Sequence, residues 1–425
     1  MTGRPAQTDR ASTPRPWLML AAGVLAQAAG TVFVTGPAFL LPLLHLERGI
    51  PLAQAGLLVS APTLGLVLTS VAWGALTDRV GERWVIAGGL ALTAAAAAGA
   101  MLASGYLGLG GFLLLGGMAA ASTNAASGRV VVGWFPRERR GLALGIRQMC
   151  QPLGVAVAAV AIPPLAASGG IGAAMALPAV LTALLAVVCA LVIVDPPRPD
   201  RPTISRPNDN PYRRTGSLMR IHAVSMLLVV PQFTISVFGL VWLTGDLGWS
   251  AAGAGLLVGS SQFVGALGRI GVGMLSDRVG SRMRPLRWVS RAAVGVMVAL
   301  SFGEFVPPWA CAIVLIVAAT VTVADNGLAY TAVAEIAGPF WAGRALGVQN
   351  TGQFVAASLV APAVGGLIAL VGYPIAFAAV ALAPAVALPL LPRHDEHAGP
   401  SRTETADTST GRTTDDEGHR QPQAR

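Results

Sequence analysis

The chain has 425 residues, of which 54% are hydrophobic and only 12% charged, and its formal net charge is +9. A water-soluble domain needs more charge to cover its surface, so this composition excludes a soluble globule and indicates a membrane protein. The basic charge could also suggest a nucleic-acid partner, but the placement of the arginines accounts for it without one.

Apolar runs of roughly twenty residues, the length of a helix that crosses a bilayer, recur along the whole chain. Prolines inside the runs are expected to kink the helices rather than end them. The sequence therefore predicts an all-α membrane protein with twelve transmembrane helices, at residues 17–44, 52–76, 84–103, 107–132, 142–165, 171–194, 221–243, 251–275, 288–305, 309–333, 345–371 and 373–391.

Arginines occupy alternate loops. They follow the second, fourth, sixth, eighth and tenth predicted helices and are present in both tails, whereas the opposite loops carry only Arg48. Because basic loops remain on the cytoplasmic side, we expect both termini in the cytoplasm and the protein in the plasma membrane, the inner membrane of a bacterium. Eight of the nine tryptophans, all but Trp73, lie at or near run ends, as an interfacial belt requires.

One phrase occurs twice: GALTDRVGER at 74–83 returns as GMLSDRVGSR at 273–282. The flanking residues match as well, since 56–83 and 255–282 are identical at 12 of 28 positions without a gap. Similar pairs link the first helix to the seventh and the fifth helix to the eleventh, where ALGIRQMCQ corresponds to ALGVQNTGQ. These repeats predict two pseudo-symmetric six-helix bundles.

The domain boundaries follow from this repeat and from composition. We predict a cytoplasmic N-terminal tail at 1–16, a first bundle at 17–194, a proline- and arginine-rich cytoplasmic linker at 195–220, a second bundle at 221–392 and a disordered cytoplasmic tail at 393–425. Two parallel bundles of this kind leave a polar path between them near the middle of the membrane, where a cargo would bind.

The repeated pattern G-x-x-x-D-R-x-G-x-R, with twelve helices around a long central loop, resembles the major facilitator superfamily over all but the tails. The resemblance implies a secondary transporter that works by alternating access. It also implies that the repeated loop is a latch, made when the cytoplasmic side is closed and broken when that side opens. The alternative is that the loop only fixes topology, although topology requires no aspartate. The gating candidates are Asp78, Arg79, Arg83, Asp277, Arg278 and Arg282.

Polar side chains within the predicted membrane helices are the candidates for substrate binding. In the fifth helix these are Arg147, Gln148 and Gln151, and the repeat places Gln349, Asn350 and Gln353 at the matching positions of the eleventh. The matched ladders could hold a ligand between the bundles, or they could hydrogen-bond helix to helix. Two further candidates, Gln27 and Gln232, lie at matching positions of the first and seventh helices.

Two charged residues in the second bundle extend the prediction to a cargo class. Arg269, which replaces Ser70 of the first repeat, has a setting that resembles the oxalate/formate antiporter and nitrate/nitrite porter branches, where an arginine at this place contacts the anion. Two guanidinium groups at one cavity suit a carboxylate. Asp325 is the best candidate to carry a coupling proton; alternatively it forms a structural ion pair with Arg269.

The predicted function is therefore secondary transport of a small solute, an organic anion such as a carboxylate, by a monomer. Its expected partners are the cargo, membrane lipid and protons as a candidate coupling ion, with no nucleic acid. The alternative is a drug/proton antiporter of the same superfamily. No enzyme motif, cofactor or metal site is expected. Cys150, Cys189 and Cys311 lie singly in three helices and are expected to be packing residues.

Overall fold

A computed structural model describes residues 15–41, 43–44, 49–103, 105–197, 210–214, 216–393 and 395. Most of the predicted N-terminal tail, Arg48, the middle of the predicted linker and nearly all of the C-terminal tail lie outside these residues. The described part is helical and contains no strand.

The first half of the chain supplies six membrane-length passes, because Gly169 and Gly170 break the long sixth helix into two. Gly170 has φ 66°, a value that a side chain disfavours, so the chain can reverse there. The helices are α1 (Pro16–Thr35) with the 3₁₀ turn Gly36–Leu40, α2 (Leu52–Val80), α3 (Glu82–Leu102), α4 (Tyr106–Trp134), α5 (Arg137–Arg147) and α6 (Cys150–Val192).

The second half repeats this plan, with the corresponding reversal at Gly372, where φ is 77°. A short helix from the linker, α7 (Pro211–Arg214), precedes it. The helices are α8 (Ser217–Gly245), α9 (Ala251–Val279), α10 (Met283–Ser301), the 3₁₀ turn Gly303–Phe305, α11 (Pro308–Val323), α12 (Asp325–Ala337), α13 (Ala342–Val380) and α14 (Leu382–Leu390).

Eight helical stretches of the described chain are long and apolar enough to cross a membrane. Two of them, Arg137–Val192 and Ala342–Leu390, contain the reversals and so cross twice. The more polar α9 and α10 have the length of a pass, with 29 and 19 residues. The described residues thus form the twelve passes that the sequence predicts.

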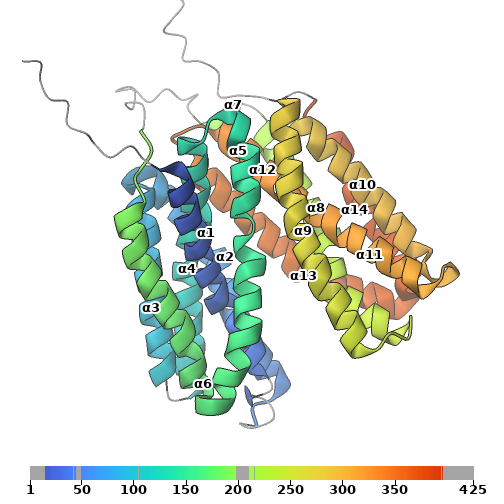
Figure 1. Ribbon diagram of the computed structural model, residues 1–425, viewed down its shortest axis with the longest axis horizontal. Coiled ribbons are helices and arrows are strands. Elements are labelled where there is room, and N and C mark those ends of the chain that lie inside the picture. The colour runs from blue at the N-terminus through green and yellow to red at the C-terminus, as the bar shows by residue number, and fades with distance from the viewer. Residues whose placement is uncertain are drawn as a thin grey trace, which may run out of the picture.

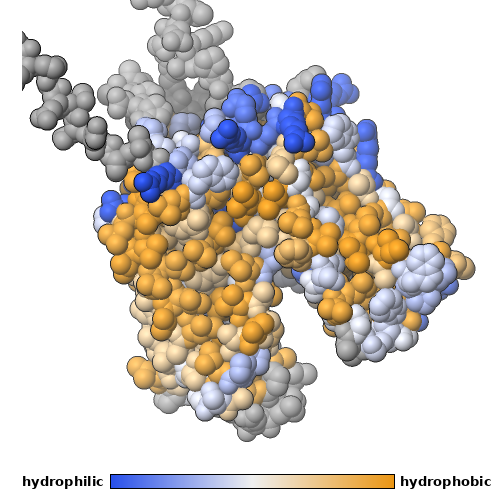
Figure 2. All heavy atoms as spheres, viewed as in Figure 1, coloured by the Kyte–Doolittle hydropathy of each residue, from blue (hydrophilic) through white to orange (hydrophobic). Residues whose placement is uncertain are grey.

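The two halves lie side by side and diverge toward one end (Figure 1). Helix α2 of the first half packs on α13 of the second, and α5 of the first half packs on α9 and α12. These contacts form the seam between the halves. Hydrophilic side chains cover the end where the halves meet, and a hollow separates them at the other (Figure 2). We call the end where the halves meet the basic end and the opposite end the open end. The basic end carries the exposed arginines Arg79, Arg139, Arg278 and Arg284.

Each half closes on itself through an aspartate just beyond its last helix. Asp195 accepts hydrogen bonds from the backbone N–H groups of Glu82 and Arg83 at 2.7 and 2.8 Å. Asp395, 200 residues later, accepts them from Arg282 and Met283 at 2.8 and 3.1 Å. The first N–H groups of a helix lack partners within it, so each aspartate satisfies two such groups at the start of α3 or α10.

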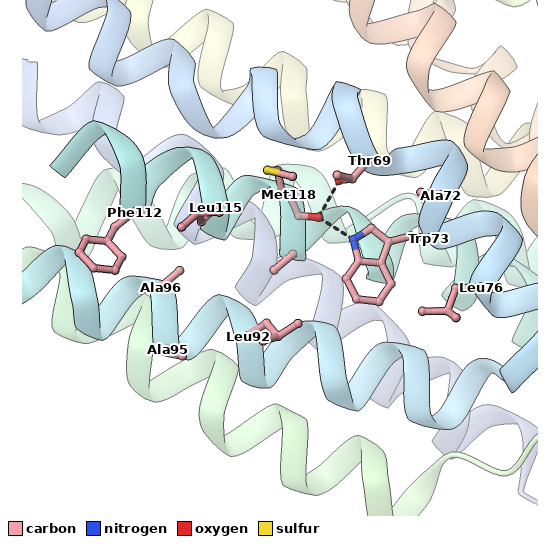
Figure 3. Close-up of a pocket in the computed structure, with 11 residues that line it drawn as sticks. Thr69, Ala72, Trp73, Leu76, Leu92, Ala95, Ala96, Phe112, Leu115 and Met118 are labelled. Atoms are coloured by element: carbon pink, nitrogen blue, oxygen red, sulfur yellow. Dashed lines mark hydrogen bonds between the residues drawn. The ribbon is translucent and has the colours of Figure 1, made fainter. Parts of the chain in front are cut away.

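Trp73, the tryptophan that lies away from run ends, has a specific partner. Its indole N–H donates to the Met118 carbonyl at 2.6 Å, and the Thr69 hydroxyl donates to the same oxygen at 2.7 Å (Figure 3). These residues belong to an apolar groove of about 650 Å³ between α2, α3 and α4, in which Leu92 is 55% exposed. The groove faces outward from the bundle, so lipid chains would fill it.

Candidate substrate site and gate

A cavity of about 370 Å³ lies between the halves, lined from α1, α2, α4 and α6 on one side and α8 and α13 on the other. Its walls are mainly apolar and include Val34, Leu66, Val155, Phe233 and Phe354. No charged side chain lines it among the described residues. A smaller cavity of about 40 Å³ shares several of these residues and is lined mostly by amides; we call this region the amide floor.

The amide floor has two matching amide pairs, one from each half. Gln27 donates to the side-chain oxygen of Asn124 in the first half. In the second half Asn326 donates to Gln232 at 3.1 Å. Both glutamines are candidates predicted from the sequence, whereas neither asparagine was predicted. Continuing the alignment of the fifth and eleventh helices back by about twenty residues would have paired Asn124 with Asn326.

The other predicted polar residues also gather at the amide floor, which is lined by Gln148, Gln151, Asn350 and Gln353. Tyr330, a residue absent from the predictions, donates its hydroxyl hydrogen to Asn350 and lies 3.2 Å from Gln353. Gln353 in turn donates to Ser225 at 2.7 Å. These polar side chains therefore make hydrogen bonds within the protein and also border the small cavity of the amide floor.

Gln349 departs from this arrangement, because it does not line either cavity. Its side-chain oxygen contacts His222 Nδ1, and the other ring nitrogen of His222 lies 3.0 Å from the Tyr212 hydroxyl. Burial raises the pKa of Tyr212 to about 12, so this hydroxyl is neutral. His222 is buried and joins α7 to α13.

Arg147 and Arg269 lie next to the amide floor but do not line it. Arg147 is 1% exposed and donates to Ser127 Oγ at 2.9 Å, to Gln148 Oε1 at 3.1 Å and to the Asn124 carbonyl. Arg269 is 7% exposed and donates to the Gln148 carbonyl at 3.0 Å and the Val323 carbonyl at 3.4 Å. Neither forms an ion pair within 4 Å of a described carboxylate.

Asp325 begins α12 and is 1% exposed. Neither of its carboxyl oxygens accepts a hydrogen bond from another described residue. The ion pair with Arg269 that the sequence offered as an alternative is therefore not formed, although Arg269 is close enough to act on Asp325 electrostatically. A buried carboxyl group without a donor is costly when ionised.

At the basic end, the two aspartates of the repeated phrase bind across the seam. Asp78 accepts from the backbone N–H groups of Gly343 and Arg344 at 2.9 and 3.1 Å. Asp277 accepts from Gly141 and from Leu142, both at 2.9 Å. Asp78 thus holds the first turn of α13, where the N–H groups carry partial positive charge, whereas Asp277 binds the second turn of α5.

The glycines of the same phrase allow this approach. A Cβ on Gly74 would lie 2.2 Å from the Gly343 carbonyl oxygen, and a Cβ on Gly273 would lie 2.2 Å from that of Gly141. Real Cβ atoms are essentially never this close to another heavy atom. The two backbones touch because neither residue has a side chain.

The arginines of the repeated phrase differ from one another. Arg282 reaches across the seam, where it donates to the Arg137 carbonyl at 2.6 Å, and it also pairs with Asp277 and Glu335. Arg83 stays within its own half and donates to the Ala190 carbonyl at 2.6 Å. Arg79 and Arg278 are exposed at the basic end.

Arg129 forms the ion pair with the aspartate of the first phrase, as Arg282 does with the aspartate of the second. It pairs with Asp78, and its Nε lies 2.9 Å from Glu82. Both carboxylates are fully buried, so the guanidinium group satisfies charges that water cannot reach. Among the described residues no three His, Cys, Asp or Glu side chains lie close enough to hold a metal ion.

Comparison with known proteins agrees with this geometry. The model of the Major Facilitator Superfamily matches residues 19–360. The MFS-type transporter Rv2994 of Mycobacterium tuberculosis is 48% identical over 377 residues, which cover 88% of this chain and 84% of that protein. Its name gives no cargo.

Two solved structures share the fold. The human organic anion transporter MFSD10 is similar with a TM-score of 0.68 at 16% identity, over 89% of this chain and all of that one. The E. coli fucose:proton symporter FucP gives 0.70 at 15% identity, over 87% and 97% of the two chains. Identities this low establish the fold alone, and the cargoes named are those of the other proteins.

The repeated phrase, the twelve passes, the cavity at the seam and the match over most of the chain lead to one conclusion. The chain belongs to the major facilitator superfamily and is a multi-pass membrane transporter.

Proposed function

We propose that this transporter moves a small organic anion, a carboxylate with an apolar body, across the plasma membrane by alternating access. The observation that supports an anion is the pair of buried guanidinium groups, Arg147 and Arg269, with no described carboxylate within 4 Å of either. A buried charge without a counter-ion is costly, and a negatively charged cargo would supply the missing partner.

The cavity walls support the apolar part of the cargo. Phe233 and Phe354 come from opposite halves, and Leu66 and Val155 add apolar surface, so a hydrocarbon body would be buried by both bundles. A volume of about 370 Å³ suits a small molecule. The amides of the floor would orient a carboxylate by hydrogen bonds and place it next to the arginines.

Asp325 is the residue that we propose to carry a coupling proton. Its carboxyl group has no hydrogen-bond donor among the other described residues and is buried beside Arg269, whose charge an arriving anion would partly neutralise. Cargo binding would thereby change how strongly Asp325 holds its proton. This coupling favours movement of the anion together with, or in exchange for, a proton.

We place the basic end in the cytoplasm, with both termini on that side, because cytoplasmic loops carry the excess of arginine. The chain would then be closed toward the cytoplasm and open to the outside. The latches of Asp78 and Asp277 are proposed to break when the cytoplasmic side opens. We propose that the working unit is a monomer in the lipid bilayer, since the cavity between the halves is formed within a single chain.

A binding screen tests the cargo class of this function. Purified protein is heated with monocarboxylates, dicarboxylates, inorganic anions and cationic drugs, and a cargo should raise the unfolding temperature. We expect monocarboxylates with an apolar body to stabilise the protein, and Arg147→Gln to abolish the effect. The matched control is Arg291→Gln, an exposed arginine of α10 that lines neither cavity. Stabilisation by cationic drugs alone would instead favour the drug/proton antiporter.

A further inference from the structure

The two buried arginines reach across the seam in opposite directions. Arg147 belongs to the first half, and its guanidinium carbon lies 5.4 Å from the ring centre of Tyr330 in the second half. Arg269 belongs to the second half, and its Nη1 donates to the Gln148 carbonyl of the first half at 3.0 Å. Each charge therefore has one neutral partner that belongs to the opposite half.

The seam is tight around these contacts. A Cβ on Gly145 would lie 2.8 Å from the Arg269 carbonyl oxygen, and one on Gly327 would lie 3.6 Å from Gly145. Helix α5 packs on both α9 and α12 here. A cargo can pass toward the basic end only if these helices separate, and the separation removes the cross-seam partners of both arginines at once.

The amide floor separates the cavity from the arginines. From the open end, the lining of the cavity contains amides, hydroxyls and apolar groups but no charged side chain. Gln148 lies between the two environments, since its side chain borders the floor while its two oxygens accept from Arg147 and from Arg269. Once the helices part, the guanidinium groups need water or an anion to replace what they lose.

We propose that Arg147 and Arg269 form an anion-binding subsite that exists only when the basic end is open. An anionic cargo then meets neutral amides when it enters from the open end and two guanidinium groups when the cavity faces the basic end. This inference rests on the proposed function for the identity of the cargo, but the charge of the opened cavity can be measured without any cargo.

A cysteine already present in the chain can report that charge. Cys150 is fully buried and lies within electrostatic range of both Arg147 and Arg269, which come from opposite halves. Opening the seam should expose its thiol to a small reagent. Cys189 is the matched control, since it is buried inside the first half and contacts the Ala22 carbonyl there.

The experiment uses chains with a single cysteine and a wedge that prevents closure of the basic end. Gly273→Trp places a large ring where even a Cβ would be 2.2 Å from the Gly141 backbone, and Gly74→Trp is the equivalent wedge should the first fail to fold. Cys150 is treated with negatively and positively charged methanethiosulfonate reagents of similar size, and the two rates are compared.

In the wedged chain we expect the anionic reagent to react with Cys150 about tenfold faster than the cationic one, as a basic cleft concentrates anions. Either Arg147→Gln or Arg269→Gln should reduce the ratio toward one. Cys189 should stay unreactive in every variant. Equal rates for the two reagents in a wedged chain, or a Cys150 that no reagent reaches in either wedge, would overturn the proposal.

A second measurement separates this inference from the proposed function. Binding of benzoate and of its neutral analogue benzamide is measured on the wedged chain and on the unmodified chain, with benzoate expected to be favoured about tenfold more in the wedged chain. If the reagents discriminate but no organic anion binds or is transported, the basic subsite stands and the proposed cargo is wrong. If anions are transported while the reagents react equally, the cargo stands and this subsite is wrong.

Discussion

Gly74→Ala tests whether backbone contact at the basic end sets the balance between the closed and open forms. The added Cβ would lie 2.2 Å from the Gly343 carbonyl oxygen and 3.0 Å from the Arg344 nitrogen. Ordinary contacts of a Cβ begin near 3.4 Å. Helices α2 and α13 would therefore have to part by about 1.2 Å, because a backbone in a packed helix cannot turn aside as a side chain can.

The size of the effect follows from the hydrogen bonds that this movement breaks. Asp78 accepts from Gly343 at 2.9 Å and from Arg344 at 3.1 Å, so the same movement lengthens both distances to about 4 Å, beyond a hydrogen bond. Hydrogen bonds to a charged group contribute about 1.5–3 kcal/mol each. Losing both costs the closed form about 3 kcal/mol at the lower limit, or a shift of about 150-fold toward the open form.

Hydrogen exchange of the first turn of α13 measures this shift directly. The amides of Gly343 and Arg344 are bonded to Asp78, so their exchange should accelerate by up to about 150-fold in Gly74→Ala. Gly88→Ala is the matched control, since a Cβ at Gly88 meets nothing within 4 Å. If these amides exchange in Gly74→Ala as they do in Gly88→Ala, the seam does not depend on the glycine contact and the reasoning fails.

Three further predictions concern aspartates. Asp78→Asn should insert normally yet slow flux in proteoliposomes about tenfold or more, because it loses the buried ion pair with Arg129; unchanged flux would reject the latch. Asp325→Asn should keep exchange of labelled cargo across the membrane but lose uptake driven by a proton gradient, and gradient-driven uptake at the normal rate would exclude this residue as the proton carrier. Asp195→Ala removes two helix-start hydrogen bonds and should lower the free energy of unfolding by about 1–2 kcal/mol, so an unchanged unfolding temperature would contradict its role as a cap.

The fold could be predicted from the sequence because the bilayer imposes it. A run of about twenty apolar residues has few alternatives to a helix, and the repeat of the phrase around Asp78 and Asp277 marks the two halves. The reversals at Gly170 and Gly372 also lie where the sequence predicts helix ends. The sequence predicted that each aspartate belongs to a latch but not which residues it binds, because residues 74–83 carry no information about the opposite half.

The candidate site was less predictable because its partners are distant in sequence. Asn124 and Asn326 contribute to the amide floor through residues nearly one hundred positions away. Tyr330 lies one helical turn after Asn326, but its partner Asn350 belongs to another helix. Arg147 likewise donates to Ser127 and to the Asn124 carbonyl, about twenty positions earlier in the chain, and composition does not reveal these partners.

The capping aspartates Asp195 and Asp395 have a consequence for how the carrier is assembled. Each ties the end of its own half to the third helix of that half, so neither hydrogen bond has to break when the halves move. A polypeptide cut between Pro197 and Asn210 would therefore retain the capping hydrogen bonds of both halves. The two fragments, synthesised separately, are expected to fold independently and to associate into an active transporter without a covalent link.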